Sequence, residues 1–339
     1  MDDKVVYLKV TNNCQLRCKH CYNDFMHNKD DMSLITLQKS IKYINELAEI
    51  LPENNIDCQL HGGEPMMYKH LDALYYWLEA QTMQFENIHW GMTTNLVYKL
   101  TPIEIAIIKL MKPYRNSNET MIQTSWDYNS RFQNPNQLAL WTNNVYTLLE
   151  HDIKVQPTIC LTNELITNYT GEKLILYMIN LGVDRINFER ITNTGRAANG
   201  SLRPNNESLD KWLLNCYKTY EYYRDKITIG LFESIEKSLN HEYLGCRARK
   251  CMQNVITINP DGSVGGCPNT AYSPIGNLDY NDPKKTTIWI QKENTRDNQC
   301  YTCEYFQYCN GDCFQLMWDN TGCPGMKSIY QYLLTKEQK

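Results

Sequence analysis

Three cysteines near the start of the chain have the spacing of a metal-binding loop. Cys14, Cys18 and Cys21 form a C-x3-C-x2-C pattern directly after the apolar run 5–10. Three thiolates on one short loop can hold three irons of a cubane cluster and leave the fourth iron without a protein ligand. A structural metal site uses four protein ligands, whereas a catalytic site leaves one position open for a substrate. Three cysteines without a fourth therefore indicate a site of chemistry. A zinc loop or three unconnected thiols are the alternatives, but this loop lacks the second C-x2-C pair of a zinc site.

This cysteine pattern resembles that of the radical S-adenosylmethionine (SAM) enzymes. The resemblance implies that the amine and carboxylate of SAM fill the open position on the cluster held by Cys14, Cys18 and Cys21. It further implies that the reduced cluster cleaves SAM to a 5′-deoxyadenosyl radical, which takes a hydrogen atom from the substrate. An electron donor of the flavodoxin or ferredoxin type is then expected as a partner.

A glycine-rich turn follows the next predicted strand. Gly62, Gly63, Glu64 and Pro65 resemble the GGEP motif of the same family, in which this segment holds the SAM amino group. The chemistry is reasonable, because glycine lets the backbone approach a ligand closely and a carboxylate accepts hydrogen bonds from an ammonium group. An ordinary strand-to-helix turn is the alternative interpretation.

Further polar residues end the third and fourth predicted strands. The resemblance assigns SAM carboxylate and ribose contacts to Thr94, Asn95, Ser125 and Asp127. Helix caps are the alternative, since these residue types cap helices routinely. Arg131 could pair with the SAM carboxylate, although the HxxR context found in related enzymes is missing here. His20 lies beside the third cysteine, where the family prefers an aromatic residue against the adenine; an exposed loop histidine is the alternative.

The elements that must position these residues alternate between short strands and longer helices. We expect strands over 5–10, 57–60, 88–92, 121–124, 154–159 and 185–189. We expect helices over 33–51 with Ser33 as N-cap, over 70–82, from Pro102 onward, and over 136–151 and 173–181. Repeated βα units indicate an α/β fold with a parallel sheet. Six units match the partial (β/α)6 TIM-like barrel of the radical SAM fold, whose chemistry lies at the carboxyl ends of the strands.

Eight further cysteines gather in the last third of the chain, where a hairpin is expected over 255–266. Their C-x2-C-x5-C-x3-C core resembles the SPASM domain, a small cysteine-rich α+β extension that binds two auxiliary [4Fe-4S] clusters. The resemblance assigns the first auxiliary cluster to Cys246, Cys251, Cys267 and Cys313, and the second to Cys300, Cys303, Cys309 and Cys323. Two structural zinc sites are the alternative for these eight thiols alone. Together with the upstream loop they favour three [4Fe-4S] clusters.

Three cysteines remain outside these sets. Cys216 falls on an amphipathic helix expected over 205–223 and is interpreted as a small buried hydrophobic residue. Cys58 and Cys160 lie in or at the end of barrel strands. A thiol there could give a hydrogen atom to a substrate radical, which makes these two the only catalytic candidates beyond the SAM cluster.

Length and composition limit the remaining possibilities. The 339 residues suit a barrel over 1–195, a connector over 196–240 and a SPASM domain over 241–339. The net charge of −4 gives no electrostatic footprint for nucleic acid. We find no signal segment and no apolar run of transmembrane length. We therefore expect a cytoplasmic protein, in which 14 cysteines favour metal or redox chemistry over disulfides.

The resemblance to SPASM-type enzymes implies a peptide or protein substrate, modified by crosslinking, thioether formation or epimerisation. Pro268 follows Cys267 where the sulfatase-maturating branch carries an Asp, which argues against that branch. The chain begins almost at its first strand, so we expect no N-terminal peptide-recognition domain; a separate recognition protein or contacts in the barrel would serve instead. Radical oxidation or rearrangement of a small metabolite is the alternative. A non-catalytic metal-binding adaptor is a further one.

Overall fold

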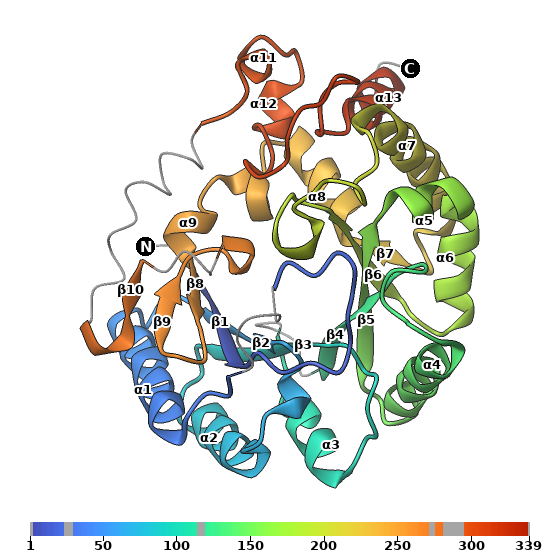
Figure 1. The fold of residues 1–339 in the computed structure, drawn as a ribbon. Coiled ribbons are helices and arrows are strands. Elements are labelled where there is room, and N and C mark those ends of the chain that lie inside the picture. The colour runs from blue at the N-terminus through green and yellow to red at the C-terminus, as the bar shows by residue number, and fades with distance from the viewer. Residues whose placement is uncertain (1–2, 24–29, 114–118, 271–274, 281–294, 338–339) are drawn as a thin grey trace.

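The strands form one curved sheet inside a layer of helices (Figure 1). The computed structural model describes residues 3–23, 30–113, 119–270, 275–280 and 295–337. Within these residues the sheet has ten strands in the order β10-β9-β8-β1-β2-β3-β4-β5-β6-β7. The strands are β1 (Lys4–Thr11), β2 (Ile56–Gly62), β3 (Ile88–Thr94), β4 (Met121–Trp126), β5 (Lys154–Leu161), β6 (Arg185–Arg190), β7 (Thr228–Ile229), β8 (Val255–Ile258), β9 (Ser263–Gly265) and β10 (Gly276–Asn277).

The larger helices lie on the outer side of the sheet (Figure 1). The helices are α1 (Leu34–Ile50), α2 (Leu71–Gln84), α3 (Pro102–Lys109), α4 (Pro135–Glu150), α5 (Asn163–Asn168), α6 (Gly171–Asn180), α7 (Asn206–Tyr223), α8 (Gly230–Leu239), α9 (Cys251–Asn254), α11 (Asn298–Tyr301), α12 (Phe306–Cys309) and α13 (Lys327–Glu337). Strands β1 to β6 pair in sequence order and in parallel. The predicted α/β fold with a partial barrel is therefore confirmed, and each of the six predicted strands is present.

Local sequence explains where the first helix begins and which side it buries. The Ser33 hydroxyl accepts a hydrogen bond from the Thr36 N–H at 3.0 Å, which satisfies one of the free donors at the helix start. Leu37, Ile41 and Ile44 recur every three or four residues and are fully or almost fully buried. Helix α1 thus covers the outer face of the sheet next to β1 and β2, as its apolar spacing predicts.

The strands present an apolar face to the helices and a polar face to the barrel interior. Phe188 on β6 packs on Trp212 of α7 and Phe232 of α8, each with ring centroids 5.7 Å apart. Side chains alternate along a strand, and paired residues of neighbouring strands share a face. From the strand register, the residues on the interior face are Tyr7, Gln59, Gly91, Thr93, Gln123, Ser125, Thr158, Cys160, Asn187 and Glu189.

The expected division into barrel, connector and C-terminal domain does not interrupt the sheet. The connector contains the short strand β7, which pairs in parallel with β6, and helix α8. Strand β8, from the segment expected to be a separate domain, pairs in parallel with β1 through Val5 and Val255. Sequence patterns missed β7 because two residues give no periodicity. They missed the pairing of β8 because partners distant in sequence leave no local signal.

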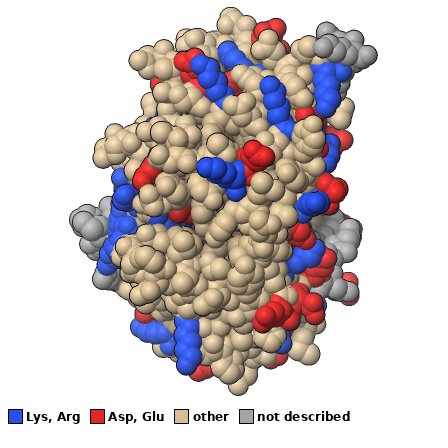
Figure 2. Space-filling model, turned by 90° about the vertical axis from the view of Figure 1, so that its right-hand side faces the viewer, with Lys and Arg blue, Asp and Glu red and all other residues tan. Residues whose placement is uncertain are grey.

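Charged side chains of both signs are scattered over the face shown in Figure 2. Lys and Arg alternate there with Asp and Glu across largely uncharged surface. Among the helices that the structure describes, none combines the length and apolarity needed to cross a membrane.

Candidate functional site

The loop that carries Cys14, Cys18 and Cys21 lies directly after β1, at the carboxyl ends of the barrel strands. Segments that follow other strands hold its backbone. The Lys19 N–H donates to the Ser130 carbonyl at 3.1 Å, beyond the end of β4. The Arg196 N–H donates to the Cys21 carbonyl at 3.0 Å, beyond the end of β6. The fold therefore places three thiols on a fixed loop at the barrel mouth.

The two glycines after β2 allow this loop to approach the sheet. The Gly63 N–H donates to the Thr11 carbonyl at 2.7 Å, and a Cβ on Gly63 would lie 2.1 Å from the Asn13 carbonyl oxygen. Gly62 has a φ of +146°, and a Cβ there would lie 2.2 Å from the Thr11 oxygen. This packing accounts for both glycines without a ligand, so their contact with SAM stays a prediction.

Glu64 is fully buried and organises the end of β3. Its carboxylate accepts from the Thr94 hydroxyl at 2.6 Å and from the Asn95 N–H at 2.7 Å. The Asn95 side-chain amide in turn lies 3.6 Å from the Cys14 sulfur. Burial raises the pKa of Glu64 to about 7, although these hydrogen bonds oppose the shift. The structure thus brings the predicted residues Glu64, Thr94 and Asn95 together beside the first cysteine.

A second polar cluster forms around Asp127 at the end of β4. Its Oδ2 accepts from Arg131 Nε at 2.5 Å, and its Oδ1 accepts from the Cys160 N–H at 3.0 Å. His20 Nε2 lies 3.4 Å from the same Oδ2. Burial alone would raise the pKa of Asp127, but the charges of His20 and Arg131 outweigh it and lower that pKa. The structure brings His20, Asp127 and Arg131 together, and their contacts with SAM stay predictions.

Ser125 differs from these residues because its hydroxyl is not used in a hydrogen bond to another described residue. It lies on the interior face of β4, opposite Thr158 on β5. Its hydroxyl forms no hydrogen bond with any residue that the structure describes. A polar group in this position can bind a ligand without breaking an internal contact, which favours Ser125 over Thr94 and Asp127 as a direct SAM contact.

The structure separates the two proposed catalytic cysteines. Cys58 is fully buried, and its register with Val6 and Trp90 places it on the helix-facing side of the sheet. The prediction of a hydrogen-donor role for Cys58 is therefore wrong, because the thiol points away from the barrel interior. Cys160 faces the interior, and burial together with the charge of Asp127 raises its pKa well above the usual value. It stays a candidate as a neutral thiol.

The first predicted auxiliary set gathers at the C-terminal side of the barrel. The Cys251 and Cys313 thiols neighbour that of Cys246, and Cys251 is the main cause that raises the pKa of Cys246. Cys267 completes the set; burial raises its pKa to about 12, and the charge of Cys313 adds to the shift. The four thiols assigned together by sequence are therefore neighbours in space.

The second predicted auxiliary set lies between α11 and α13. A Cβ on Gly325 would lie 3.1 Å from the Cys323 sulfur and 3.2 Å from the Cys309 sulfur. Burial raises the pKa of Cys323 to about 11, and the charges of Cys300 and Cys303 contribute. Four thiols are the ligand number of a [4Fe-4S] cluster and of a structural zinc ion alike. The identity of the bound metal therefore stays a prediction at both sets.

A buried carboxylate fastens the C-terminal region to the barrel. Asp312 pairs with Arg190 at the end of β6 at 2.9 Å and with Arg247 at 3.1 Å. Only 3% of Arg247 and 3% of Asp312 is exposed. The two arginines outweigh the cost of burial and hold the pKa of Asp312 far below its usual value. Because Asp312 precedes Cys313 and Arg247 follows Cys246, this ion-pair network joins the first auxiliary set to β6.

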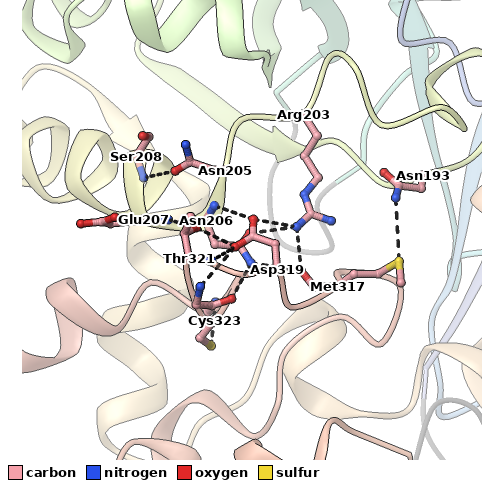
Figure 3. Close-up of polar contacts among 12 residues, drawn as sticks. Asn193, Arg203, Asn205, Asn206, Glu207, Ser208, Met317, Asp319, Thr321 and Cys323 are labelled. Carbon is pink, nitrogen blue, oxygen red and sulfur yellow. Dashed lines mark hydrogen bonds and ion pairs between the residues drawn. The ribbon is translucent and has the colours of Figure 1, made fainter.

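A second connection lies at the start of α7 (Figure 3). Asp319 accepts from the Asn206 N–H at 2.9 Å and from Arg203 at 3.3 Å. The Asn206 amide donates to the Gly322 carbonyl at 2.7 Å, directly before Cys323. The loop that ends at Cys323 is thus held by the segment that leaves the barrel.

Sequence reasoning missed several polar residues inside the barrel. Lys9 is fully buried on β1 and donates to Asn23 at 2.8 Å, and the Tyr22 hydroxyl lies 2.8 Å from His61 Nε2. Glu189 lies near the end of β6. One signal could have found Glu189, because it is a charged residue at the carboxyl end of a predicted barrel strand. Lys9 gave no such signal within an apolar run.

Comparisons with known proteins agree with this arrangement. Residues 5–122 match the family described as a 4Fe-4S single cluster domain. The chain is 24% identical over 322 residues to the uncharacterized protein MJ0907 of Methanocaldococcus jannaschii, covering 89% of this chain and 96% of that protein. It is 22% identical over 388 residues to the radical SAM cyclopropyl synthase TigE of Paramaledivibacter caminithermalis, covering 99% and 75% of the two chains.

Two solved structures share the fold over most of the chain. One is anSMEcpe with bound AdoMet and the Cp18Cys peptide, with a TM-score of 0.75, 14% identity, and coverage of 98% of this chain and 97% of that one. The other is Streptococcus suis SuiB bound to its precursor peptide SuiA, with a TM-score of 0.61, 15% identity, and coverage of 93% and 72%.

The cysteine loop at the barrel mouth and the clustered C-terminal thiols define a metal-dependent enzyme of the partial-barrel class. Together with the family match and the relatives, they support a radical SAM protein of the SPASM type. The family match over residues 5–122 supports a [4Fe-4S] cluster, and AdoMet is bound in the similar structure of anSMEcpe.

Proposed function

We propose that the chain modifies a peptide or protein, at a side chain or a Cα, by radical SAM chemistry. The observation that carries this proposal is the gathering of one three-cysteine loop and two four-cysteine sets around one barrel. A peptide substrate is supported by the peptides bound in the structures of anSMEcpe and SuiB. Crosslinking, thioether formation and epimerisation are the candidate modifications.

The residues at the mouth divide into ligands and positioning groups. Cys14, Cys18 and Cys21 would hold the cluster, which together with SAM supplies a radical that removes a hydrogen atom from the substrate. Ser125 would donate its hydroxyl to SAM, since no described residue occupies that group. Glu64 would act by holding the Asn95 backbone beside Cys14.

The auxiliary sets would have different roles. Cys246, Cys251, Cys267 and Cys313 lie on the barrel side, and we assign electron acceptance to the cluster that they would hold. Cys300, Cys303, Cys309 and Cys323 lie farther out and would keep this region folded and relay electrons outward. An external electron donor of the flavodoxin or ferredoxin type and a separate peptide-recognition protein are the partners that we propose.

Deuterium transfer tests the proposal and the substrate class together. Cells of the source organism are grown in deuterated medium, and their extract is separated into a peptide fraction and a small-metabolite fraction. Each fraction is incubated anaerobically with the cluster-loaded enzyme, unlabelled SAM and a reductant. Because the substrate gives a hydrogen atom to the radical, the 5′-deoxyadenosine formed acquires deuterium only where a substrate is present.

Deuterated 5′-deoxyadenosine from the peptide fraction, and its loss after protease treatment, is the expected result. Deuterium transfer from the metabolite fraction alone would replace the peptide with a small molecule. Bound zinc without charge-transfer absorption, and no SAM cleavage, would favour a metal-binding adaptor. A Cys14→Ala, Cys18→Ala, Cys21→Ala variant is the control, since it lacks the proposed ligands of the SAM cluster.

A further inference from the structure

Glu189 occupies a distinctive position at the end of β6. Its Cα pairs with that of Cys160 on β5, which places its side chain on the interior face. Its neighbours in sequence point elsewhere. Phe188 packs into the helix layer, and Arg190 donates to Asp312 at 2.9 Å and to the Pro324 carbonyl at 3.1 Å. Because these two contacts fix the strand on both sides, the direction of the Glu189 side chain is also fixed.

Glu189 lacks the internal partners that the other carboxylates of the site have. Glu64, Asp127 and Asp312 each accept at least two hydrogen bonds. Glu189 forms no hydrogen bond and no ion pair with any residue in the described ranges. Its side chain is accessible although it faces the barrel interior. A carboxylate in this state is available to a bound molecule.

The groups that face Glu189 come from four separate segments. Burial raises the pKa of Tyr7 on β1, with the charges of Cys267 and Glu189 contributing. The charge of Glu189 also acts on Tyr22 of the cysteine loop and on Cys160 of β5. Tyr22 follows Cys21, a proposed ligand of the SAM cluster, and Cys267 is a proposed ligand of the first auxiliary cluster. The charge of Glu189 thus acts on groups beside both proposed cluster sites.

We propose that Glu189 is the proton acceptor in substrate oxidation. This inference rests on the proposed function. The substrate carbon that has lost a hydrogen atom still carries one unpaired electron, and a neighbouring N–H, O–H or S–H group still carries its proton. That proton passes to a carboxylate oxygen of Glu189, while the electron leaves by the route assigned to the first auxiliary set. The substrate is then oxidised by two electrons, and neutral Glu189 returns the proton to solvent.

The surroundings of Glu189 suit a base. The surrounding barrel removes much of the bulk solvent from Glu189 and raises its pKa, although the side chain stays accessible to a small molecule. The Arg190 guanidinium opposes this shift, and the Asp312 carboxylate adds to it. A carboxylate whose pKa is raised holds a proton more strongly, which improves it as a general base near neutral pH. Pro268 follows Cys267 in this chain, so that position offers no carboxylate. Glu189 on β6 supplies a carboxylate to the barrel interior instead.

A Glu189→Gln variant tests the inference, with Glu172→Gln as the control. Glu172 is an exposed residue in the first turn of α6 and carries the same charge. The first measurement is an infrared pH titration of the cluster-loaded protein without SAM or substrate. Glu64 and Glu189 should both contribute to the protonated-carboxyl band that titrates above the usual range of glutamate. We expect the part due to Glu189 to be lost in Glu189→Gln and the whole band to persist in Glu172→Gln. An unchanged band in Glu189→Gln would overturn the inference.

The second measurement uses the deuterated fraction that labels 5′-deoxyadenosine. We expect Glu189→Gln to transfer deuterium as the wild type does, while formation of the two-electron-oxidised product falls by about 10²- to 10⁴-fold, the range for loss of a general base. Normal product formation, or loss of deuterium transfer itself, would overturn the assignment. If the wild type transfers no deuterium from any fraction, the proposed function fails, and the infrared result still reports on Glu189 separately.

Discussion

Adjacent residues on β4 have opposite roles because they face opposite sides of the sheet. Thr124 faces the helices, where its hydroxyl accepts a hydrogen bond from the Trp141 indole at 3.1 Å. Ser125 faces the barrel interior and has no partner among the described residues. The Thr124 hydroxyl therefore stabilises the fold, and the Ser125 hydroxyl stays a proposed contact for SAM.

We predict that Ser125→Ala weakens SAM binding by about 1–3 kcal/mol, the value of a lost hydrogen bond to a charged group. Its thermal unfolding midpoint and iron content should match the wild type. The matched variant Thr124→Val should show the reverse, because it leaves a buried indole N–H unsatisfied at a cost of about 1–3 kcal/mol. Equilibrium binding and thermal unfolding measure the two effects. Equal losses of SAM affinity in both variants would contradict the assignment.

Glu64 gives a pH-dependent prediction. Its pKa in the folded protein is raised to about 7, so the native state holds this proton more strongly than the unfolded chain does. The stability that protonation gives is complete below the unfolded pKa and is lost as the pH rises through about 7. Glu64→Gln does not titrate. Its stability relative to the wild type should therefore rise by on the order of 3 kcal/mol between about pH 4.5 and 8.

Thermal unfolding of both proteins across this pH range checks the Glu64 prediction. Glu79→Gln on α2 is the control, since Glu79 lies outside the site and contacts Tyr75. A constant difference between wild type and Glu64→Gln at every pH would mean that the carboxyl does not titrate as inferred. Iron content should be the same in all three proteins, because Glu64 is not a proposed ligand.

At the scale of elements, the turn after β2 and the cysteine loop form one packing unit. Gly63 meets backbone atoms of the loop, which cannot move without displacing the cysteines. Gly91 on β3 also has a close neighbour, because a Cβ there would lie 2.4 Å from the Gln59 side-chain amide. That amide ends a flexible side chain and can shift.

We predict that Gly63→Ala lowers iron content and SAM cleavage together, since the loop can no longer dock on the end of β2. Gly91→Ala should retain its iron, because only a side chain has to move. Iron analysis and 5′-deoxyadenosine formation after anaerobic reconstitution distinguish the two variants. Full iron in Gly63→Ala would show that the loop tolerates displacement.

The elements were largely predictable, and the faces of the strands were not. Apolar runs and caps such as Ser33 located β1 to β6 and most large helices, because these signals are local. Apolar and polar residues alternate along β2 and β5, which groups Cys58 with the apolar residues and Cys160 with the polar ones, but the sequence does not say which group lines the barrel interior. The cysteine sets could be grouped from their spacing and family resemblance, but Glu189 could be recognised only once β6 had been placed.

At the scale of the whole molecule, Asp312 connects the C-terminal region to the barrel. We predict that Asp312→Ala destabilises the protein by about 3–5 kcal/mol, because Arg190 and Arg247 then remain buried without a counter-ion. Asp279→Ala removes an exposed ion pair with Lys39 and should cost under about 1 kcal/mol. Chemical unfolding of the two variants tests this difference. Similar stabilities would mean that water or other groups replace Asp312.

Iron content tests the number of clusters. Eleven cysteines in three sets predict three [4Fe-4S] clusters and about twelve irons per chain. Replacing Cys14, Cys18 and Cys21 by alanine should remove about one third of the iron and abolish SAM cleavage. Cys160→Ala should leave iron unchanged, because that thiol belongs to none of the sets. Full iron and continued SAM cleavage in the triple variant would show that the assignment of the SAM cluster is wrong.

The pairing of β8 with β1 has a consequence for protein synthesis. Val5 and Val255 are direct partners, yet they leave the ribosome about 250 residues apart, which takes tens of seconds at about 5–20 residues per second. During that interval β1, the strand that leads into the cysteine loop, has one unpaired edge. Unpaired edges recruit strands from other chains. A nascent or truncated chain that lacks β8 is therefore exposed to aggregation at the strand that leads into the cysteine loop.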